Sequence, residues 1–205
     1  MNVPDPGPAS LFREGLGFLE LPRLLLRMPE LSRLPRGDGQ PVMVLPGFAA
    51  TDASTLVLQG YLRLLGYNVR GWRMGVNTGR MATLLPRVLR RVSRTAELAG
   101  EPVRLVGWSL GGVLAREAAR ERPELVRRVI TLGSPITDSR LEARELTPIR
   151  VPITAIWSRA DGIVPWQACI DVRSPDVENV EVGATHIGLG FSPDVYRLIA
   201  ERLAR

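Results

Sequence analysis

The sequence contains no lysine, one cysteine and one histidine among its 205 residues. A single cysteine, Cys169, excludes an internal disulfide framework and a metal site built on several cysteines, and it agrees with a reducing compartment. We expect Cys169 to be a small core residue. The one histidine is His186, so any reaction that needs an imidazole base has no substitute for it elsewhere in the chain.

Long apolar runs are also missing from the sequence. No stretch approaches the roughly twenty apolar residues that a membrane-spanning helix needs. The apolar segment near the N-terminus is interrupted by Glu20, Pro22 and Arg23, and no basic region precedes it, so it lacks the pattern of a secretory signal. We therefore expect a cytoplasmic protein.

The net charge of +6 comes from arginine alone. A basic balance suits nucleic acid, anionic lipid or acidic substrates. However, the arginines are spread among acidic residues, and neither an arginine–aromatic ladder nor zinc-finger spacing occurs, so we expect no nucleic-acid partner. Four arginines have the spacing of the outer, solvated face of one helix: Arg87, Arg90, Arg91 and Arg94.

The length allows one domain with a sizeable core. We divide the chain into an N-terminal Pro/Leu-rich segment, residues 1–40, and a main domain, residues 41–205. Within the first, residues 11–34 contain Pro22 and Pro29, which predicts two or three short amphipathic helices. We expect these helices to pack on the core or to cover the site. A weak contact with a membrane surface is the alternative.

Short apolar runs alternate with helical patterns from residue 41 onward. This alternation predicts an α/β fold with a doubly wound, mostly parallel sheet, helices on both faces, and ligands at the carboxyl ends of the strands. One helix is expected at Thr83–Leu98, with Pro86 in its first turn. The six expected strands are Pro41–Leu45, Tyr67–Trp72, Val103–Val106, Val129–Leu132, Val151–Trp157 and Val177–Val182.

The third expected strand runs directly into the sequence Gly-Trp-Ser-Leu-Gly, and a segment of small helix-forming residues follows. This is the pattern of a nucleophile elbow, a sharp strand-to-helix turn that lifts a serine hydroxyl above the edge of a sheet. Gly107 and Gly111 flank the turn because side chains there would collide with the neighbouring strand and helix. We predict that Ser109 is a nucleophile.

A serine nucleophile needs a general base and an acidic group that orients the base. His186 follows the last expected strand, and therefore lies at the carboxyl edge of the sheet. Asp161 is the better candidate for the acid, because it follows the fifth strand in a short loop and gives the expected order of serine, acid and histidine. Asp138, in a longer polar segment after the fourth strand, is the alternative.

Two backbone N–H groups are expected to stabilise the negative charge that develops on the substrate oxygen. The elbow pattern places one of them at Leu110, directly after the nucleophile, and the other in the loop after the first strand, at Phe48. No side chain of residues 46–50 can take this role, so both donors belong to the main chain.

Together these motifs resemble small α/β-hydrolases of the lipase and carboxylesterase kind. The resemblance covers about residues 41–205 and rests on Leu45–Phe48, Gly107–Gly112, Ser158–Pro165 and Thr185–His186. It implies cleavage of a small-molecule carboxylic ester through an acyl-serine intermediate, without a metal or organic cofactor. The Gly-Phe loop is similar to that of enzymes that take short to medium acyl chains.

The sequence departs from the full fold of that family in two places. Its first two antiparallel strands have no counterpart in the N-terminal segment, and the stretch between the fourth and fifth strands leaves room for a loop rather than a large cap domain. Two other functions stay open: an acyltransferase that uses the same triad, and a non-catalytic interaction protein with this fold. The sequence does not indicate an oligomeric state.

Overall fold

The computed structural model describes residues 14–136 and 147–205, so Asp138 lies outside the described residues. In the described part, six strands form one sheet in the order β2-β1-β3-β4-β5-β6, and every neighbouring pair is parallel. This confirms the predicted parallel sheet. The strands are β1 (Pro41–Leu45), β2 (Asn68–Gly71), β3 (Val103–Trp108), β4 (Val126–Leu132), β5 (Ile153–Trp157) and β6 (Val177–Glu181).

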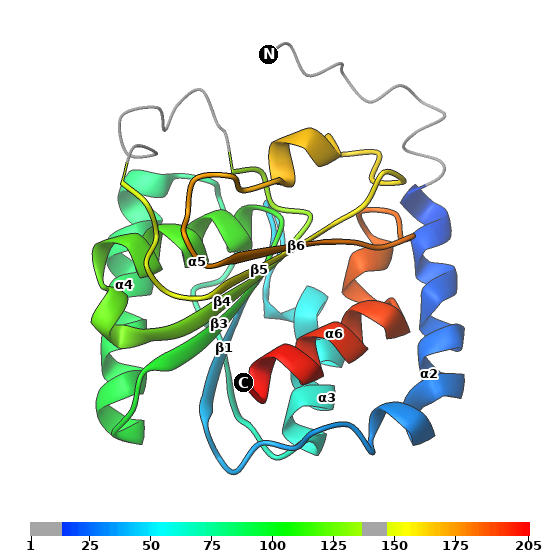
Figure 1. Cartoon of the computed structure of the whole chain (residues 1–205), viewed down its shortest axis with the longest axis horizontal. Coiled ribbons are helices and arrows are strands. Elements are labelled where there is room, and N and C mark those ends of the chain that lie inside the picture. The colour runs from blue at the N-terminus through cyan, green and yellow to red at the C-terminus, as the bar shows by residue number, and fades with distance from the viewer. Residues whose placement is uncertain (1–13, 137–146) are drawn as a thin grey trace.

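Helices cover both faces of the sheet, as the alternation of patterns predicts. In Figure 1, α4 and α5 lie on one face and α3 and α6 on the other, with α2 on the outer side of α6. The α-helices are α2 (Glu20–Leu31), α3 (Leu56–Leu64), α4 (Met81–Ala99), α5 (Leu110–Glu121) and α6 (Pro193–Leu203). The short 3-10 helices are η1 (Leu16–Leu19), η2 (Asp52–Thr55), η3 (Pro123–Leu125), η4 (Trp166–Cys169) and η5 (Gly188–Gly190).

The central strands are apolar on both faces, because each face is covered by helices. Successive residues of β1 illustrate this: Val44 packs in the cluster under α3 and α6, whereas Met43 and Leu45 pack in the cluster under α4 and α5. Each of these side chains is at most 1% exposed. The two clusters therefore fill the space between the sheet and its two helical layers.

The strand order creates a switch point between β1 and β3. From β1 the chain runs to β2 on one side, and it then crosses to β3 on the other side. Leu45 lies opposite Gly107 in the register of the two strands, so the loops that follow β1 and β3 leave the sheet side by side. In open α/β sheets, ligands bind at such a point, outside the carboxyl ends of the strands.

Three prolines occupy positions that differ from the sequence-based expectation. The helix α2 is continuous through Pro22 and Pro29, so the expected breaks within residues 11–34 are wrong there. Pro22 lies in the first turn of the helix, where a backbone N–H has no partner within the helix, so its absence costs no hydrogen bond. Pro29 removes one backbone hydrogen bond, the one that the carbonyl of Leu25 would accept. Leu25 is exposed, so water can hydrogen-bond to this carbonyl instead. Pro86 lies in the second turn of α4, not the first, because the helix begins at Met81.

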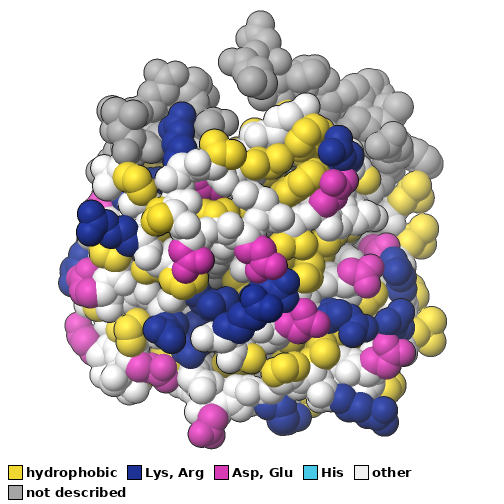
Figure 2. Space-filling view, viewed as in Figure 1, with side chains coloured by type: hydrophobic (Ala, Val, Ile, Leu, Met, Phe, Trp, Pro, Cys, Tyr) yellow, Lys and Arg dark blue, Asp and Glu magenta, His cyan; other side chains and the backbone are white. Residues whose placement is uncertain are grey.

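The described part of the N-terminal segment packs against the main domain through one face of α2. Leu24 and Leu31 are buried in the cluster that also contains α6, while Leu25 and Leu26 are exposed. No helix among the described residues is long and apolar enough to cross a membrane. On the face of the molecule seen in Figure 2, basic and acidic side chains lie interspersed.

Candidate active site

Ser109 joins β3 to α5 in a backbone conformation that L-residues rarely adopt, with φ 53° and ψ −123°. Such strain persists only where the surrounding structure enforces it, and it is common at functional sites. The flanking glycines are required: a Cβ at Gly107 would lie 2.4 Å from Cα of Gly112, and one at Gly111 would lie 2.2 Å from the carbonyl oxygen of Leu45. The turn therefore has the geometry of a nucleophile elbow, with Ser109 at its apex.

Asp161 and His186 form a buried hydrogen-bonded pair. The distance between His186 Nδ1 and Asp161 Oδ2 is 2.7 Å, and the two side chains are 7% and 1% exposed. The other carboxylate oxygen, Oδ1, accepts the backbone N–H groups of Ile163 and Val164 at 2.9 and 2.7 Å, which fixes the acid. Because an ionised carboxylate only accepts, the imidazole proton belongs on Nδ1, and in a neutral imidazole the lone pair that can act as a base is then on Nε2.

This pair lies beside the elbow. Ser109 donates its backbone N–H to the carbonyl of Leu132 at 2.8 Å. Gly133, the residue after Leu132, faces the side chains of Asp161 and His186. A Cβ on Gly133 would lie 2.8 Å from Asp161 Oδ2 and 3.0 Å from His186 Nδ1, and Gly133 also has a φ of 52°. The structure thus pairs Asp161 with His186 and places this pair against Gly133, which directly follows the residue that accepts the Ser109 N–H. Gly133 is not among the residues predicted from the sequence, although a glycine directly after a buried strand is a usable signal.

Trp108, the residue before the predicted nucleophile, holds the loop that carries the histidine. Its indole N–H donates to the carbonyl of His186 at 3.2 Å, and the centroids of the two rings are 6.3 Å apart. The rings of Trp108 and Phe191 pack in a T-shaped arrangement with 6.2 Å between centroids, and a Cβ on Gly190 would lie 2.7 Å from the indole. Trp108 therefore links the elbow to the histidine loop, a role that its local sequence does not reveal.

The two predicted oxyanion donors flank Ser109. A Cβ on Gly47 would lie 3.3 Å from Cβ of Ser109, so the loop after β1 contacts the serine directly. Within residues 14–136 and 147–205, neither the N–H of Phe48 nor that of Leu110 donates a backbone hydrogen bond. Leu110 is the first residue of α5, where the helix dipole also favours negative charge. No described backbone carbonyl therefore occupies either N–H group, which the predicted oxyanion role requires.

Asn77 fixes the loop that carries Phe48. This fully buried side chain donates its amide to the carbonyl of Pro46 at 2.9 Å. Its backbone N–H donates to the carbonyl of Ala50, and its carbonyl accepts the N–H of Ala49, both at 2.8 Å. Asn77 is not predictable from the sequence, because the loop that it holds lies about thirty residues earlier in the chain and no local pattern connects them.

No protein-family profile matches the sequence, and no curated protein matches it significantly. Solved structures do match. An α/β-hydrolase enzyme from a sediment metagenome of the Mar Chica lagoon, Morocco, is 19% identical with a TM-score of 0.63, and the match covers 82% of this chain and 91% of that one. A mature lipase of Bacillus licheniformis is 14% identical with a TM-score of 0.64, covering 84% and 94%. This chain has the α/β-hydrolase fold.

A third match extends further along the chain. The naproxen esterase of Bacillus subtilis is 13% identical with a TM-score of 0.62, and the match covers 92% of this chain and 98% of that one. At identities this low, the structural matches show the α/β-hydrolase fold alone. The described structure contains no cap domain, as expected from the short stretch between β4 and β5.

The described residues contain no group of three or more His, Cys, Asp or Glu side chains that could hold a metal ion. Cys169 is buried, as expected, and burial raises the pKa of its thiol to about 12. The thiol is therefore neutral near pH 7 and a poor nucleophile.

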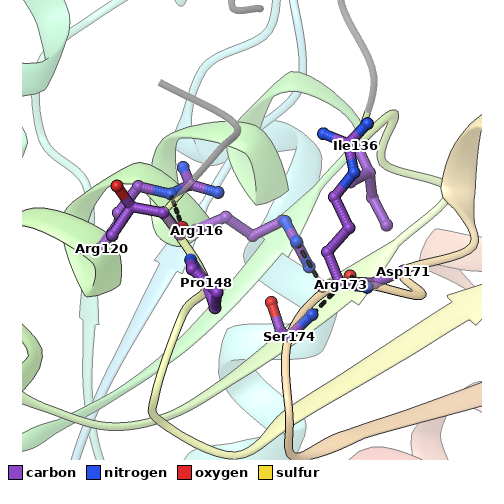
Figure 3. Close-up of a pocket in the computed structure, with 8 residues that line it drawn as sticks. Arg116, Arg120, Ile136, Pro148, Asp171, Arg173 and Ser174 are labelled. Atoms are coloured by element: carbon purple, nitrogen blue, oxygen red, sulfur yellow. Dashed lines mark hydrogen bonds and ion pairs between the residues drawn. The ribbon is translucent and has the colours of Figure 1, made fainter. Parts of the chain in front are cut away.

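A hollow away from the predicted site residues, drawn in Figure 3, lies beside α5 and is built around a buried ion pair. Arg116 Nη2 donates to Asp171 Oδ2 at 2.6 Å, and the two side chains are 4% and 1% exposed. Asp171 Oδ1 also accepts the backbone N–H groups of Arg173 and Ser174, at 2.8 and 3.1 Å. Because these partners satisfy the carboxylate, we interpret the pair as an anchor between α5 and the chain before β6.

Burial alone raises the pKa of Asp171, but the hydrogen bonds from Arg116 and the two backbone N–H groups outweigh it and lower the pKa to about 2. We expect Asp171→Asn to lower the free energy of unfolding by about 3 kcal/mol at pH 7, because it leaves the Arg116 charge buried without its partner. The ionised pair stabilises the fold above the unfolded pKa of about 4, and this stability disappears as the pH falls toward 2.

Chemical denaturation at pH 7 and at pH 3 measures this effect. The matched control is Asp194→Asn, which removes an exposed carboxylate that pairs with Arg23 at 3.5 Å and contributes little. The loss caused by Asp171→Asn should shrink at the lower pH. Equal losses in the two variants would contradict the anchoring role of Asp171.

Proposed function

We propose that this protein is a serine hydrolase that cleaves carboxylic esters with short to medium acyl chains. The observation that carries the proposal is the buried hydrogen bond between Asp161 and His186, 2.7 Å long, beside a strained elbow with Ser109 at its apex. Nucleophile, base and orienting acid recur in this arrangement in acyl-transfer enzymes on unrelated folds. Lipases and esterases among the structural matches agree with this proposal.

In the first half of the proposed reaction, Ser109 Oγ attacks the ester carbonyl carbon while His186 Nε2 takes the hydroxyl proton. Asp161 stabilises the imidazolium that forms. The carbonyl oxygen becomes an oxyanion, which the N–H groups of Phe48 and Leu110 stabilise. The tetrahedral intermediate then collapses: the bond to the alkoxy oxygen breaks, His186 returns its proton to the departing alcohol, and Ser109 carries the acyl group.

In the second half, water replaces the alcohol. His186 Nε2 takes a proton from the water as its oxygen attacks the acyl carbon, and the same N–H groups stabilise the new oxyanion. Collapse of this intermediate breaks the bond to Ser109 Oγ, which receives the proton, and the carboxylic acid leaves. All proton transfers thus pass through one imidazole, which agrees with a chain that contains a single histidine.

The test is hydrolysis of p-nitrophenyl esters in a series from acetate to palmitate. We expect release of p-nitrophenol with kcat/KM highest for short to medium chains, because the Gly-Phe loop after β1 is similar to that of enzymes that take such chains. A phosphonate ester should add one phosphonyl group, located on Ser109 by mass spectrometry of the digested protein. Absence of hydrolysis across the whole series would contradict the proposal.

The same assay separates hydrolysis from acyl transfer. Both reactions use one acyl-serine and differ in whether water or another alcohol attacks it. Adding a short alcohol in water and measuring the new ester by chromatography gives the partition between the two. We expect the free acid as the main product, and an excess of the new ester would favour an acyltransferase.

A further inference from the structure

A buried carboxylate from the N-terminal segment contacts both loops that carry the acid and the base. Glu14 is 2% exposed. Its Oε1 accepts the backbone N–H of Gly162 at 2.8 Å and that of His186 at 3.1 Å. Its Oε2 accepts the backbone N–H of Ile187 at 2.8 Å. One side chain, more than a hundred residues away in the chain, therefore joins the residue after Asp161 to His186 itself.

The three backbone N–H groups satisfy the hydrogen-bonding needs of the buried Glu14 carboxylate. A buried charge is costly unless it is hydrogen-bonded, and an ionised carboxylate offers acceptor positions on both oxygens. Bonds from N–H groups to a carboxylate are stronger than bonds between neutral groups. An amide cannot replace it fully, because one of its two terminal atoms is itself a donor and would face an N–H group.

The chain that follows Glu14 is packed directly on the histidine loop. A Cβ on Gly17 would lie 2.5 Å from Thr185 Oγ1 and 2.6 Å from the backbone N of Gly188, so glycine is needed for this approach. The ring of Phe18 lies against that of Phe191, with 5.8 Å between centroids. Residues 14–19 thus form a clasp over the histidine loop, with the Glu14 carboxylate at its inner end.

We propose that Glu14 is a positioning residue of the active site, which holds the acid loop against the base loop so that the His186 ring keeps its bond to Asp161. This inference rests on the proposed function for its effect on the reaction, whereas the contact itself is independent of any substrate. The N-terminal segment then contributes to catalysis through Glu14.

The kinetic test compares Glu14→Gln with wild type on the preferred ester. We expect kcat to fall by about tenfold to a hundredfold, since small misplacements of reacting groups cost that much, with KM nearly unchanged. The matched control is Glu30→Gln in α2, which removes an exposed carboxylate that pairs with Arg27 and should leave kcat unchanged. Equal kcat values for Glu14→Gln and wild type would overturn the proposal.

A second readout does not depend on activity. The chain contains one histidine, so the Nδ1 proton that bonds to Asp161 gives a single imidazole N–H signal in proton NMR. We expect this signal to be sharp in wild type and in Glu30→Gln, and broadened by exchange with water in Glu14→Gln. An unchanged signal in Glu14→Gln would overturn the proposal even if wild type hydrolyses no ester, whereas failure of the ester assay alone contradicts only the proposed function.

Hydrogen exchange on the wild-type protein covers the case in which Glu14→Gln does not fold. The backbone amides of Gly162, His186 and Ile187 should exchange slowly, because each donates to the buried carboxylate. Exchange of these amides at the rate of an unstructured peptide would overturn the proposal.

Discussion

Replacing Ser109 by alanine is expected to lower kcat for ester hydrolysis by about ten-thousandfold or more. The variant loses the attacking oxygen but keeps the backbone donors at Phe48 and Leu110 and the pair of Asp161 and His186. The residual rate should therefore be that of water attacking an ester held next to an oxyanion site. Steady-state hydrolysis of the preferred p-nitrophenyl ester measures the rate of the variant. Exposure of the same variant to the phosphonate, followed by mass spectrometry, measures whether the protein still takes up the phosphonyl group.

The control for this experiment is Ser93→Ala, which removes a hydroxyl from the exposed side of α4, where it donates to Glu97 at 2.8 Å. Its kcat should equal that of wild type. Alanine at position 109 would have the same strained backbone conformation as Ser109, so the substitution neither adds nor removes this strain. The unfolding midpoints of Ser109→Ala and Ser93→Ala should therefore be similar. Phosphonate labelling that persists in Ser109→Ala would place the nucleophile elsewhere.

The second large effect is expected at Asp161, where asparagine should lower kcat by about ten-thousandfold. The amide keeps the shape of the side chain, but its oxygen is needed by the N–H groups of Ile163 and Val164, so its NH₂ group faces His186. The imidazole then accepts at Nδ1 and carries its proton on Nε2, the tautomer that cannot take a proton from Ser109. The preferred ester and the imidazole N–H signal in NMR together measure this change.

Asp138→Asn is the matched control, because the sequence leaves Asp138 as the alternative acid. We expect this variant to keep the wild-type kcat and the wild-type imidazole signal. The same large loss in Asp138→Asn, or full activity in Asp161→Asn, would contradict the assignment of the acid.

The predictable part of the structure is the part that local sequence encodes. Apolar runs and their spacing predict all six strands, with bounds that differ from the observed ones by at most three residues at either end. The glycines around Ser109 predict the sharp turn, because its backbone approach excludes side chains. Helix breaks at proline were predicted less well: α2 continues through Pro29, since the one carbonyl that loses its partner is close to solvent.

The residues of the site that the sequence does not predict have one property in common. Gly133, Trp108 and Asn77 all act on segments that are distant in the chain, through a close approach, an indole hydrogen bond and a buried amide. Nothing in their neighbouring residues indicates the partner. Hydrogen-bond partners of this kind are set by how the elements pack, and a linear pattern contains no information about that packing.

By itself the sequence determined the α/β order of the elements, the elbow around Ser109, and the choice of His186 as the single candidate base. These features depend on periodicity, on glycine at positions of close approach, and on composition, which are all local. The tertiary structure alone decided that Asp161 bonds to His186 and that Glu14 joins their two loops. Both depend on atoms that the folded sheet brings within hydrogen-bond distance. The order of serine, acid and histidine makes Asp161 a candidate for the acid, whereas no sequence pattern connects Glu14 to either loop.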